Sequence, residues 1–373
     1  MAALQQHQST PTPEGFRLPG PQGREYLPFA YRAIDLNSRG RIAPHPPRNV
    51  FIEVTNHCNL LCETCPRTFT TYETPQTLSW ENFLAIVEQF PQMERAVLHG
   101  IGEPLLNKAL PQMIAHLKAR DVTVLFNTNG TLLNDKWSRK LIAAGLDELR
   151  VSIDGADPKT YALIRGAPLL HKVVGNLKRF VQIQKAMNVS HPRPSLWMTG
   201  MKENIGELPE VIRMAAHMGV PEVYLQRMVY YADGTADAPG MMGQGHGLFA
   251  NEDEEIERIV AESEGLAQTL GVKLWASGAT TAKNSIAAKK ESRPWSACLR
   301  PWTTAYITAN GNALPCCIAP FATSDYDSLK LGNVFESAFA DVWNAPAYQQ
   351  WREQLLSDDP HPACAACGVC WSL

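Results

Sequence analysis

Hydrophobic positions between residues 49 and 276 switch repeatedly between two periodicities. Short runs of β-branched and aromatic residues predict strands, and apolar residues spaced by three or four predict helices. Strand and helix alternate about six times with short connections, which predicts an α/β fold with a parallel sheet covered by helices, as an open or partial barrel. The predicted strands lie in NVFIEVT, AVLHG, VTVLFNTNG, ELRVSIDG, SLWMTG, EVYLQRM and VKLWA. The predicted helices cover 80–90, 110–119, 135–144, 169–187, 206–218 and 252–270.

Residues at the ends of several predicted helices support these boundaries. Ser79 is suited to cap the first helix and Asn251 the last, whose first turn is acidic. Gly145 and Gly219 follow two other helices, where glycine commonly ends a helix. Polar and glycine-rich residues cluster just after the strands, and in such folds the loops at the carboxyl ends of strands carry the site.

Two segments flank the predicted barrel, which we expect to span residues 47–278. Residues 1–46 are rich in Gln, Pro, Gly and Arg without periodicity, which predicts an irregular extension. In residues 279–373, AYITA and NALPCC surround Asn310-Gly311, which predicts a β-hairpin. A tail this small cannot bury a large core, which favours a metal as a staple.

Two further segments carry local signals. Residues 232–250 are glycine-rich, which predicts a mobile loop or lid. We expect Met241, Met242 and His246 to lie in a solvated loop, with a lid over the substrate as the alternative. Residues 337–356 have a largely helical pattern that Pro346 is expected to break or restart.

Composition excludes several broad classes of protein. The 373 residues carry a formal net charge of −3, so the whole chain is not suited to act as a polycation on nucleic acid. No apolar run reaches about 18 residues, which predicts no membrane-spanning helix. The first residues show neither a basic start nor an apolar stretch of the secretory type, so we expect a cytoplasmic protein.

Nine cysteines are clustered rather than scattered. Without a secretion signal, clustered thiols indicate metal ligation rather than disulfides. Cys58, Cys62 and Cys65 directly follow the first predicted strand, and three ligands leave one position of an inorganic centre open for chemistry. A structural zinc site with His57 as fourth ligand is the alternative.

The spacing CxxxCxxC after the first strand of a (β/α) barrel resembles the signature of the radical S-adenosylmethionine (SAM) superfamily. Further segments after successive strands resemble motifs of the same family, in the same order: Gly102-Glu103-Pro104, Asn127-Thr128-Asn129-Gly130, VSIDG and YALIRGAP with Arg165. The resemblance covers residues 48 to about 230. It implies a partial (β/α)6 barrel, a [4Fe–4S] cluster on the three cysteines, and reductive cleavage of SAM to a 5′-deoxyadenosyl radical. It also implies SAM contacts from Gly102, Glu103, Pro104, Asn127, Asn129, Ser152 and Asp154.

Two positions depart from the family pattern. Thr64 replaces an often aromatic residue before the third cysteine, and Ile101 replaces the first glycine of GGEP, although Gly100 stands one position earlier. Neither touches the expected cluster ligands.

The C-terminal cysteines resemble the twitch or SPASM auxiliary-cluster domain of some radical SAM enzymes. The pattern C-x12-G-x4-C runs from Cys298 through Gly311 to Cys316, and Cys364 and Cys367 form a later CxxC. The resemblance implies one auxiliary [4Fe–4S] cluster on these four cysteines. A second auxiliary cluster is not expected, because the full SPASM pattern requires further cysteines downstream.

Cys317 and Cys370 remain unassigned. Cys317 fits a small buried hydrophobe, and either residue could be the ligand in place of its neighbour. A third reading makes them hydrogen-atom donors, since some radical epimerases use a cysteine thiol.

Other residues carry weaker signals. His99 precedes the GIGEP segment and is either a core histidine or a residue of the active site. Arg227, Tyr230 and Tyr231 follow the sixth strand and are candidate substrate contacts. The tryptophans of the tail are expected to pack its core: Trp295, Trp302, Trp343 and Trp351.

The resemblance implies a radical SAM enzyme whose substrate is open. The N-terminal extension is shorter than a leader-binding domain of about 80 residues, and this favours a small polar metabolite such as a sugar, cyclitol or nucleoside. That substrate would undergo oxidation, epimerisation or decarboxylation. The alternative is a maturase that modifies a ribosomal peptide or protein, and a distant alternative is a non-catalytic metal-binding protein. A flavodoxin- or ferredoxin-type electron donor is expected as partner.

Overall fold

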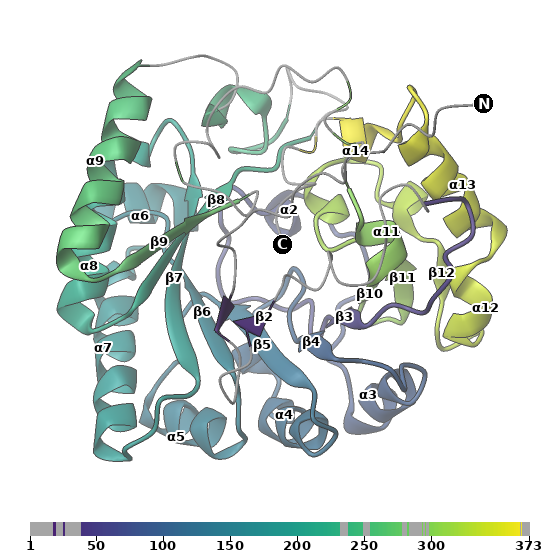
Figure 1. Cartoon of the computed structure of the whole chain (residues 1–373), viewed down its shortest axis with the longest axis horizontal. Helices are drawn as coiled ribbons and strands as arrows, with labels where there is room; N and C mark the ends of the chain where they lie inside the picture. Colours follow the sequence, from purple (N-terminus) through teal and green to yellow (C-terminus); the bar gives the residue numbers. More distant parts are fainter. Residues whose placement is uncertain are drawn as a thin grey trace, which may run out of the picture.

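The computed structural model describes residues 39–231, 238–248, 254–277 and 298–365, with 18–19, 25–26, 282, 293, 295 and 367. Its main feature is a ten-stranded sheet with the order β12-β11-β10-β3-β4-β5-β6-β7-β8-β9 (Figure 1). Two short strands of the N-terminal extension, β1 (Leu18–Pro19) and β2 (Glu25–Tyr26), pair with each other.

Strands β3 to β9 are parallel and follow one another in sequence order. All seven strands predicted from the hydrophobic pattern are therefore present. Their bounds are β3 (Asn49–Ile52), β4 (Arg95–Val97), β5 (Thr123–Thr128), β6 (Glu148–Ser152), β7 (Arg193–Gly200), β8 (Glu222–Arg227) and β9 (Lys273–Ala276).

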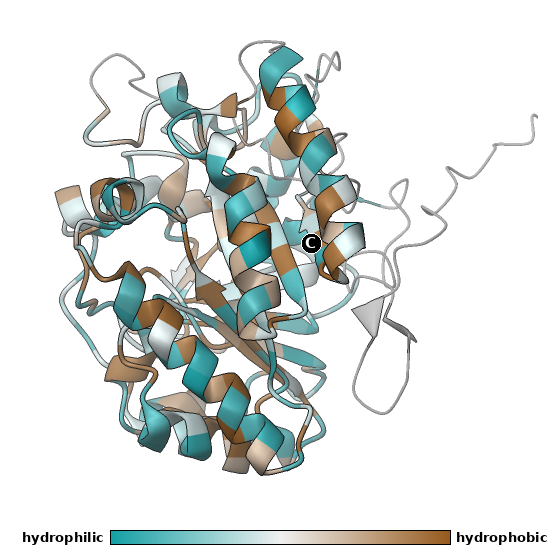
Figure 2. Cartoon of the chain, turned by 90° about the vertical axis from the view of Figure 1, so that its left-hand side faces the viewer, coloured by the Kyte–Doolittle hydropathy of each residue, from teal (hydrophilic) through white to brown (hydrophobic). Residues whose placement is uncertain are grey.

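Helices between the strands cover one face of the curved sheet (Figure 1). Their bounds are α3 (Trp80–Val87), α4 (Leu110–Lys118), α5 (Asp135–Ala143), α6 (Pro158–Arg165), α7 (Leu170–Ala186), α8 (Leu208–Met218) and α9 (Glu254–Leu270). Hydrophobic and hydrophilic residues alternate along these helices (Figure 2), as expected for helices with one face on a sheet. Ser79 caps α3 as predicted, and Gly219 ends α8 with a φ of 75°. Asn251, the predicted cap of α9, lies outside the described residues.

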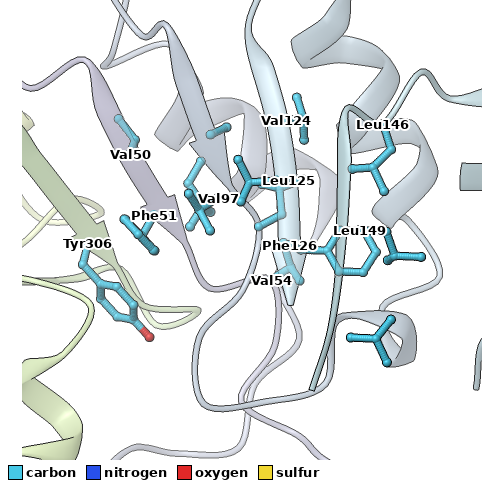
Figure 3. Close-up of a cluster of buried hydrophobic side chains, with 14 of the residues drawn as sticks. Val50, Phe51, Val54, Val97, Val124, Leu125, Phe126, Leu146, Leu149 and Tyr306 are labelled. Atoms are coloured by element: carbon cyan, nitrogen blue, oxygen red, sulfur yellow. The ribbon is translucent and has the colours of Figure 1, made fainter. Parts of the chain in front are cut away.

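The two faces of the sheet differ in polarity. In β6, Leu149 and Val151 are fully buried and point to the helices, whereas Glu148, Arg150 and Ser152 are only half-buried. Figure 3 shows part of the apolar layer, with Val124, Phe126 and Leu149 on neighbouring strands. A parallel sheet packed on both faces would be apolar on both. The face opposite the helices, here called the inner face, is polar at β6, although Phe51, Val97 and Leu125 of the preceding strands are buried on it. Its polar part is therefore suited to a ligand.

The predicted C-terminal hairpin is confirmed and joins the main sheet. It consists of β10 (Thr304–Ile307) and β11 (Asn312–Leu314), followed by β12 (Gly332–Asn333). Strand β10 pairs in parallel with β3, with Ile307 opposite Ile52. Buried side chains of the tail belong to the same hydrophobic cluster as those of the barrel, so we find no separate small core in the described part. The division of the chain at residues 46 and 278 remains a prediction.

Helices of the tail pack on this hairpin. They are α11 (Arg300–Thr303), α12 (Phe339–Trp343), α13 (Pro346–Leu356) and α14 (Pro362–Ala365). Pro346 is the first residue of α13, so it restarts the helix as expected. Trp302, Trp343 and Trp351 are buried in the tail, which confirms their packing role.

One expectation for the glycine-rich segment is wrong. Within its described part, residues 238–248, Met242 is fully buried and Met241 is 9% exposed. The backbone of Met241 donates a hydrogen bond to Glu63, at 2.8 Å. Met241 also packs with Ile164, Met201 and Met228 in a small apolar cluster. Glu63 on the cysteine-bearing loop therefore contacts a segment that its glycine content predicted to be exposed to solvent.

Among the described residues, no helix is both long and apolar enough to cross a bilayer.

Candidate radical SAM and auxiliary cluster sites

The first three cysteines lie on a loop that folds back on itself after β3. Cys65 precedes α2 (Pro66–Phe69), whose Arg67 donates hydrogen bonds to the carbonyl oxygens of Cys58 and Leu60, at 2.9 and 3.1 Å. The hydroxyl of Thr68 donates to the carbonyl of Cys62, at 2.8 Å. The loop therefore presents its three thiols from a fixed backbone.

The three thiols lie close enough to affect one another. Burial, together with the neighbouring Cys62 and Cys58, raises the pKa of Cys65 to about 12. Burial also raises the pKa of Cys62, although the guanidinium of Arg165 opposes this. Thiols held in this way bind a proton unless a metal replaces it.

The geometry of this group does not favour a single metal ion. Across the described parts of the chain, no three His, Cys, Asp or Glu side chains are placed to hold a single metal ion. The zinc alternative with His57 therefore gains no support from the geometry. Iron bound here would be held by Cys58, Cys62 and Cys65, and the fourth position would be free for SAM.

The segment Gly102-Glu103-Pro104 packs directly on the cysteine loop. A Cβ on Gly102 would lie 2.1 Å from the carbonyl oxygen of Thr55 and 2.6 Å from that of His57. The backbone N–H of Glu103 donates to the same His57 carbonyl, at 2.8 Å. Pro104, also an expected SAM contact, is buried at the start of a short 3-10 helix. Only a glycine at position 102 allows the backbone to lie this close to the carbonyl oxygens of Thr55 and His57.

The carboxylate of Glu103 is held by the protein itself. It accepts hydrogen bonds from the hydroxyl of Thr128 at 2.6 Å and the backbone of Asn129 at 2.7 Å. Burial raises its pKa, and these hydrogen bonds oppose the shift. Glu103 therefore ties the loop after β4 to the loop after β5, while its expected contact with SAM remains a prediction.

Asn129 extends this connection to the cluster loop. Its Nδ2 donates to Asn59 Oδ1 at 2.9 Å and lies 3.9 Å from Cys58 Sγ. Asn127 lies two residues earlier, and its Oδ1 is buried without a hydrogen-bond partner. An orphaned buried acceptor at this place is consistent with a ligand donor.

Asp154 and Arg165 form a buried ion pair on the other side of the cysteines. Arg165 Nη1 lies 3.0 Å from Asp154 Oδ2, and Asp154 also accepts the backbone N–H of Thr199 at 2.8 Å. Burial lowers the pKa of Arg165, but Cys62 and Asp154 outweigh it and hold the pKa above its ordinary value. Ser152 is half-buried on the inner face, opposite Trp197.

His99 is a packed residue that accepts a hydrogen bond. Its Nδ1 accepts the backbone N–H of Asn127 at 3.2 Å, and its ring meets Phe51 edge-on. Burial, with a smaller effect of the Arg150 and Arg95 charges, lowers its pKa to about 3. The ring is therefore neutral at physiological pH.

Residues further along the inner face are aromatic and charged. Trp197 stacks on Tyr224 with ring centroids 3.9 Å apart, and Arg150 lies 4.4 Å from the Trp197 ring. Arg150 also pairs with Glu148, at 2.9 Å. Two of the candidate substrate contacts at the end of β8 bond within the protein: the backbone N–H of Arg227 donates to the hydroxyl oxygen of Ser277 at 3.1 Å, and the hydroxyl of Tyr231 bonds to that of Tyr72.

The expected auxiliary cysteines come together at the opposite end of the sheet. Cys298 precedes β10, which is parallel to β3, and Cys316 follows the antiparallel β11. Burial raises the pKa of Cys364, and Cys298, Cys316 and Cys367 each raise it further. These four thiols therefore form one group, as the predicted ligand set requires.

Cys317 differs from this group. Its Sγ accepts a hydrogen bond from Arg300 Nη1 at 2.7 Å, and its charge also acts on Arg95 and Tyr306 of the barrel strands. Burial lowers the pKa of Arg300, but the surrounding cysteines outweigh it and hold the pKa above its usual range. Cys370 lies outside the described residues.

Sequence reasoning missed three residues that hold these loops. Arg67 and Arg300 each stand two positions after a candidate ligand, and that spacing was the available signal. Gly166 ends α6, and a Cβ there would lie 2.1 Å from the carbonyl oxygen of Leu61. No local pattern announces this long-range contact.

Comparisons with known proteins agree with this geometry. The family model of the radical SAM superfamily matches residues 52–215, and that of the SPASM iron–sulfur cluster-binding domain matches residues 298–371.

Two curated relatives are similar over most of their length. A tungsten-containing aldehyde ferredoxin oxidoreductase cofactor-modifying protein of Pyrococcus furiosus is 24% identical over 86% of this chain and 87% of its own. A PqqA peptide cyclase of Granulibacter bethesdensis is 24% identical over 87% of this chain and 82% of its own.

A solved structure has a similar fold. Streptococcus suis SuiB bound to precursor peptide SuiA has a TM-score of 0.63 at 15% identity, covering 87% of this chain and 76% of SuiB.

The cofactors of such domains are a [4Fe–4S] cluster, SAM and auxiliary iron–sulfur clusters. The first cysteine group lies within the range matched by the radical SAM model, and the C-terminal group lies within the range matched by the SPASM model. This chain therefore belongs to the radical SAM superfamily and is an enzyme with a SPASM iron–sulfur domain at its C-terminal end.

Proposed function

We propose that this enzyme is a maturase that modifies a peptide or protein by abstracting a hydrogen atom from it. The similarity to PqqA peptide cyclases carries the proposal, because it extends over 87% of this chain and so includes both the barrel and the tail. The fold shared with peptide-bound SuiB is compatible with it. The expectation of a small polar metabolite thereby becomes the second candidate.

That second candidate keeps one observation in its favour. The Pyrococcus relative, named as a cofactor-modifying protein, is equally similar, at 24% identity. A small non-peptide substrate therefore remains the alternative to be tested beside a peptide.

The proposed roles of the residues follow from their places. Cys58, Cys62 and Cys65 hold the cluster to which SAM binds, and this cofactor pair supplies a 5′-deoxyadenosyl radical. The approach to the cluster and SAM is lined by Gly102, Pro104, Asn127, Ser152 and Asp154. Glu103 and Asn129 hold the loops that face it, and Arg165 keeps the Asp154 carboxylate in place.

The inner face is the proposed place of the substrate. It lies between the two cysteine groups, since one follows β3 and the other precedes the parallel strand β10. Trp197, Tyr224 and Arg150 offer an aromatic and cationic wall there. Such a wall suits a peptide side chain. A radical formed on that side chain would be shielded from water.

Cys298, Cys316, Cys364 and Cys367 are the proposed ligands of one auxiliary cluster, in a unit we place at residues 279–373. We place the Cys317 thiol nearest to the inner face and propose it as a candidate hydrogen-atom donor. Cys370 is the second candidate for this role.

The test is a substrate-dependent isotope transfer. Reconstituted enzyme, SAM and a reductant are incubated anaerobically with peptides encoded beside the gene, made with deuterated residues. We expect deuterium in 5′-deoxyadenosine and a peptide of altered mass. The Cys58→Ala, Cys62→Ala, Cys65→Ala variant is the control and should yield neither. Deuterium transfer from a small metabolite, and from no peptide, would reverse the choice of substrate.

A further inference from the structure

Arg300 occupies a special place between the auxiliary cysteines and the inner face. It is the first residue of α11, two positions after Cys298. Its Nη1 donates to Cys317 Sγ at 2.7 Å, and it interacts electrostatically with Cys298, Cys316 and Cys367. A guanidinium keeps its proton in proteins, so this positive charge is permanent.

The surroundings of the other cysteine group are different. Near Cys62, the charge of Arg165 faces the buried carboxylate of Asp154, 3.0 Å away. Among the described residues, the groups that act most strongly on Arg300 are cysteines. A second arginine, Arg39, donates to the carbonyl oxygen of Cys298 at 2.9 Å. Two guanidinium groups therefore lie beside the auxiliary cysteines.

We propose that Arg300 raises the reduction potential of the auxiliary cluster by holding a positive charge beside its cysteine ligands. Reduction adds one negative charge to a cluster, and net charge and hydrogen bonds around the sulfurs set its potential. A nearby cation stabilises the reduced form more than the oxidised form. The interaction is strong because Arg300 lies in a poorly solvated region at the end of the barrel.

The consequence concerns the type of reaction, and this part rests on the proposed function. A substrate that loses a hydrogen atom to the 5′-deoxyadenosyl radical is left with one unpaired electron. A cluster of raised potential accepts that electron, and a proton passes to water, so the substrate is oxidised by two electrons. SAM ends as methionine and 5′-deoxyadenosine, and a one-electron carrier protein reoxidises the cluster. Arg300 thus favours oxidation over epimerisation.

The test is a redox titration that needs no substrate. Anaerobically reconstituted enzyme is titrated with EPR detection, for wild type, Arg300→Gln and Arg300→Lys. The auxiliary signal is assigned in the Cys58→Ala, Cys62→Ala, Cys65→Ala background. We expect Arg300→Gln to lower the reduced-to-oxidised ratio at fixed potential at least tenfold, a shift of 59 mV for one electron. Arg300→Lys keeps the charge and should therefore keep most of the wild-type reduced-to-oxidised ratio.

Three outcomes would overturn the inference. One is an unchanged auxiliary potential in Arg300→Gln with full iron content. Another is an equal fall in Arg300→Lys, because the effect would then come from geometry and not from charge. If Arg300→Gln fails to hold auxiliary iron, Arg300→Lys decides alone, and a potential well below wild type refutes the role of the charge. None of these results depends on whether the substrate is a peptide.

Discussion

Backbone contact at a single glycine holds the segment Gly102-Glu103-Pro104, the expected SAM contact, against the cysteine loop. Gly102 approaches the carbonyl oxygens of Thr55 and His57 more closely than any side chain allows. Gly100 has a different partner, since a Cβ there would lie 2.0 Å from the carboxylate of Glu53. The two glycines of HGIGEP therefore serve two contacts, which explains why Ile101 can stand between them.

Gly102→Ala should separate these loops. The new methyl group meets backbone atoms that cannot rotate away, so we expect at least a tenfold loss of 5′-deoxyadenosine formation with weaker SAM binding. Gly175→Ala is the matched control, because Gly175 is an exposed residue of helix α7 and a Cβ there would have no neighbour within 4 Å. That change should leave activity unchanged and raise stability by about 0.5–1 kcal/mol. Normal SAM binding in Gly102→Ala would contradict the proposed role.

The half-buried His99 should make stability fall in mild acid. Its folded pKa is about 3 against an ordinary value of 6.5, so between these values the unfolded chain takes up a proton that the folded chain excludes. The free energy of unfolding therefore decreases as the pH falls through this window and is unaffected above it. His99→Gln should reduce the pH slope between pH 6.5 and 5 by up to about one proton. Anaerobic urea titrations of the wild-type and His99→Gln holoproteins at several pH values measure this slope. Equal slopes would refute the role of His99.

At the residue scale, motifs that act through local spacing were predictable. The cysteine spacing and the GEP, NTNG and SIDG segments identified the loops that the structure brings together. The partner of each side chain was not predictable, because Glu103 meets Thr128 and Asn129 only after two strands pair. The role of Glu103 as a tether between loops came only from the structure.

Helix α13 shows how one buried polar residue can join several elements. Arg352 is fully buried, and it donates to the carbonyl oxygens of Pro301 and Trp343 and to the side chain of Asn344, at 2.8–2.9 Å. Its guanidinium lies 4.5 Å from the ring centre of Trp343. The helix is thereby fixed to α11 and α12.

Arg352→Met should destabilise the tail strongly. Several buried acceptors lose their donor at once, so we expect a loss of about 3 kcal/mol in the free energy of unfolding. Arg213→Met is the control, because that side chain is 52% exposed and pairs with Glu210 on its own helix. It should change stability by less than about 0.5 kcal/mol. Denaturant titration of both variants distinguishes them, and equal stabilities would show that Arg352 is dispensable.

At the element scale, hydrophobic periodicity predicted the strands of the parallel sheet and most of the helices between them. It did not predict that β10 would pair with β3. Thr304 and Asn49 lie opposite each other although 255 positions separate them, and neither segment encodes its neighbour. The buried methionines of residues 238–248 were missed for the same reason, since their partners lie on the cysteine loop.

Across the whole molecule, the two cysteine groups lie at opposite ends of neighbouring strands, one after β3 and the other at the start of the parallel β10. Each should bind its iron independently. Wild type should hold about eight iron atoms and Cys298→Ala, Cys316→Ala about four, with SAM cleavage retained. Cys317→Ala is the matched control and should keep the full iron content. Anaerobic iron and sulfide analysis measures this, and loss of iron in Cys317→Ala would place Cys317 among the ligands.

The parallel pairing of β10 with β3 also has a consequence for biosynthesis. The ribosome releases β3 early and β10 about 250 residues later. Until then, the strand that leads into the cysteine loop is an exposed sheet edge, a surface that invites pairing with other chains. Nascent or truncated chains are thus vulnerable to aggregation at this edge. The C-terminal segment completes the barrel as it emerges, so the catalytic half of this enzyme matures only after its last quarter has been made.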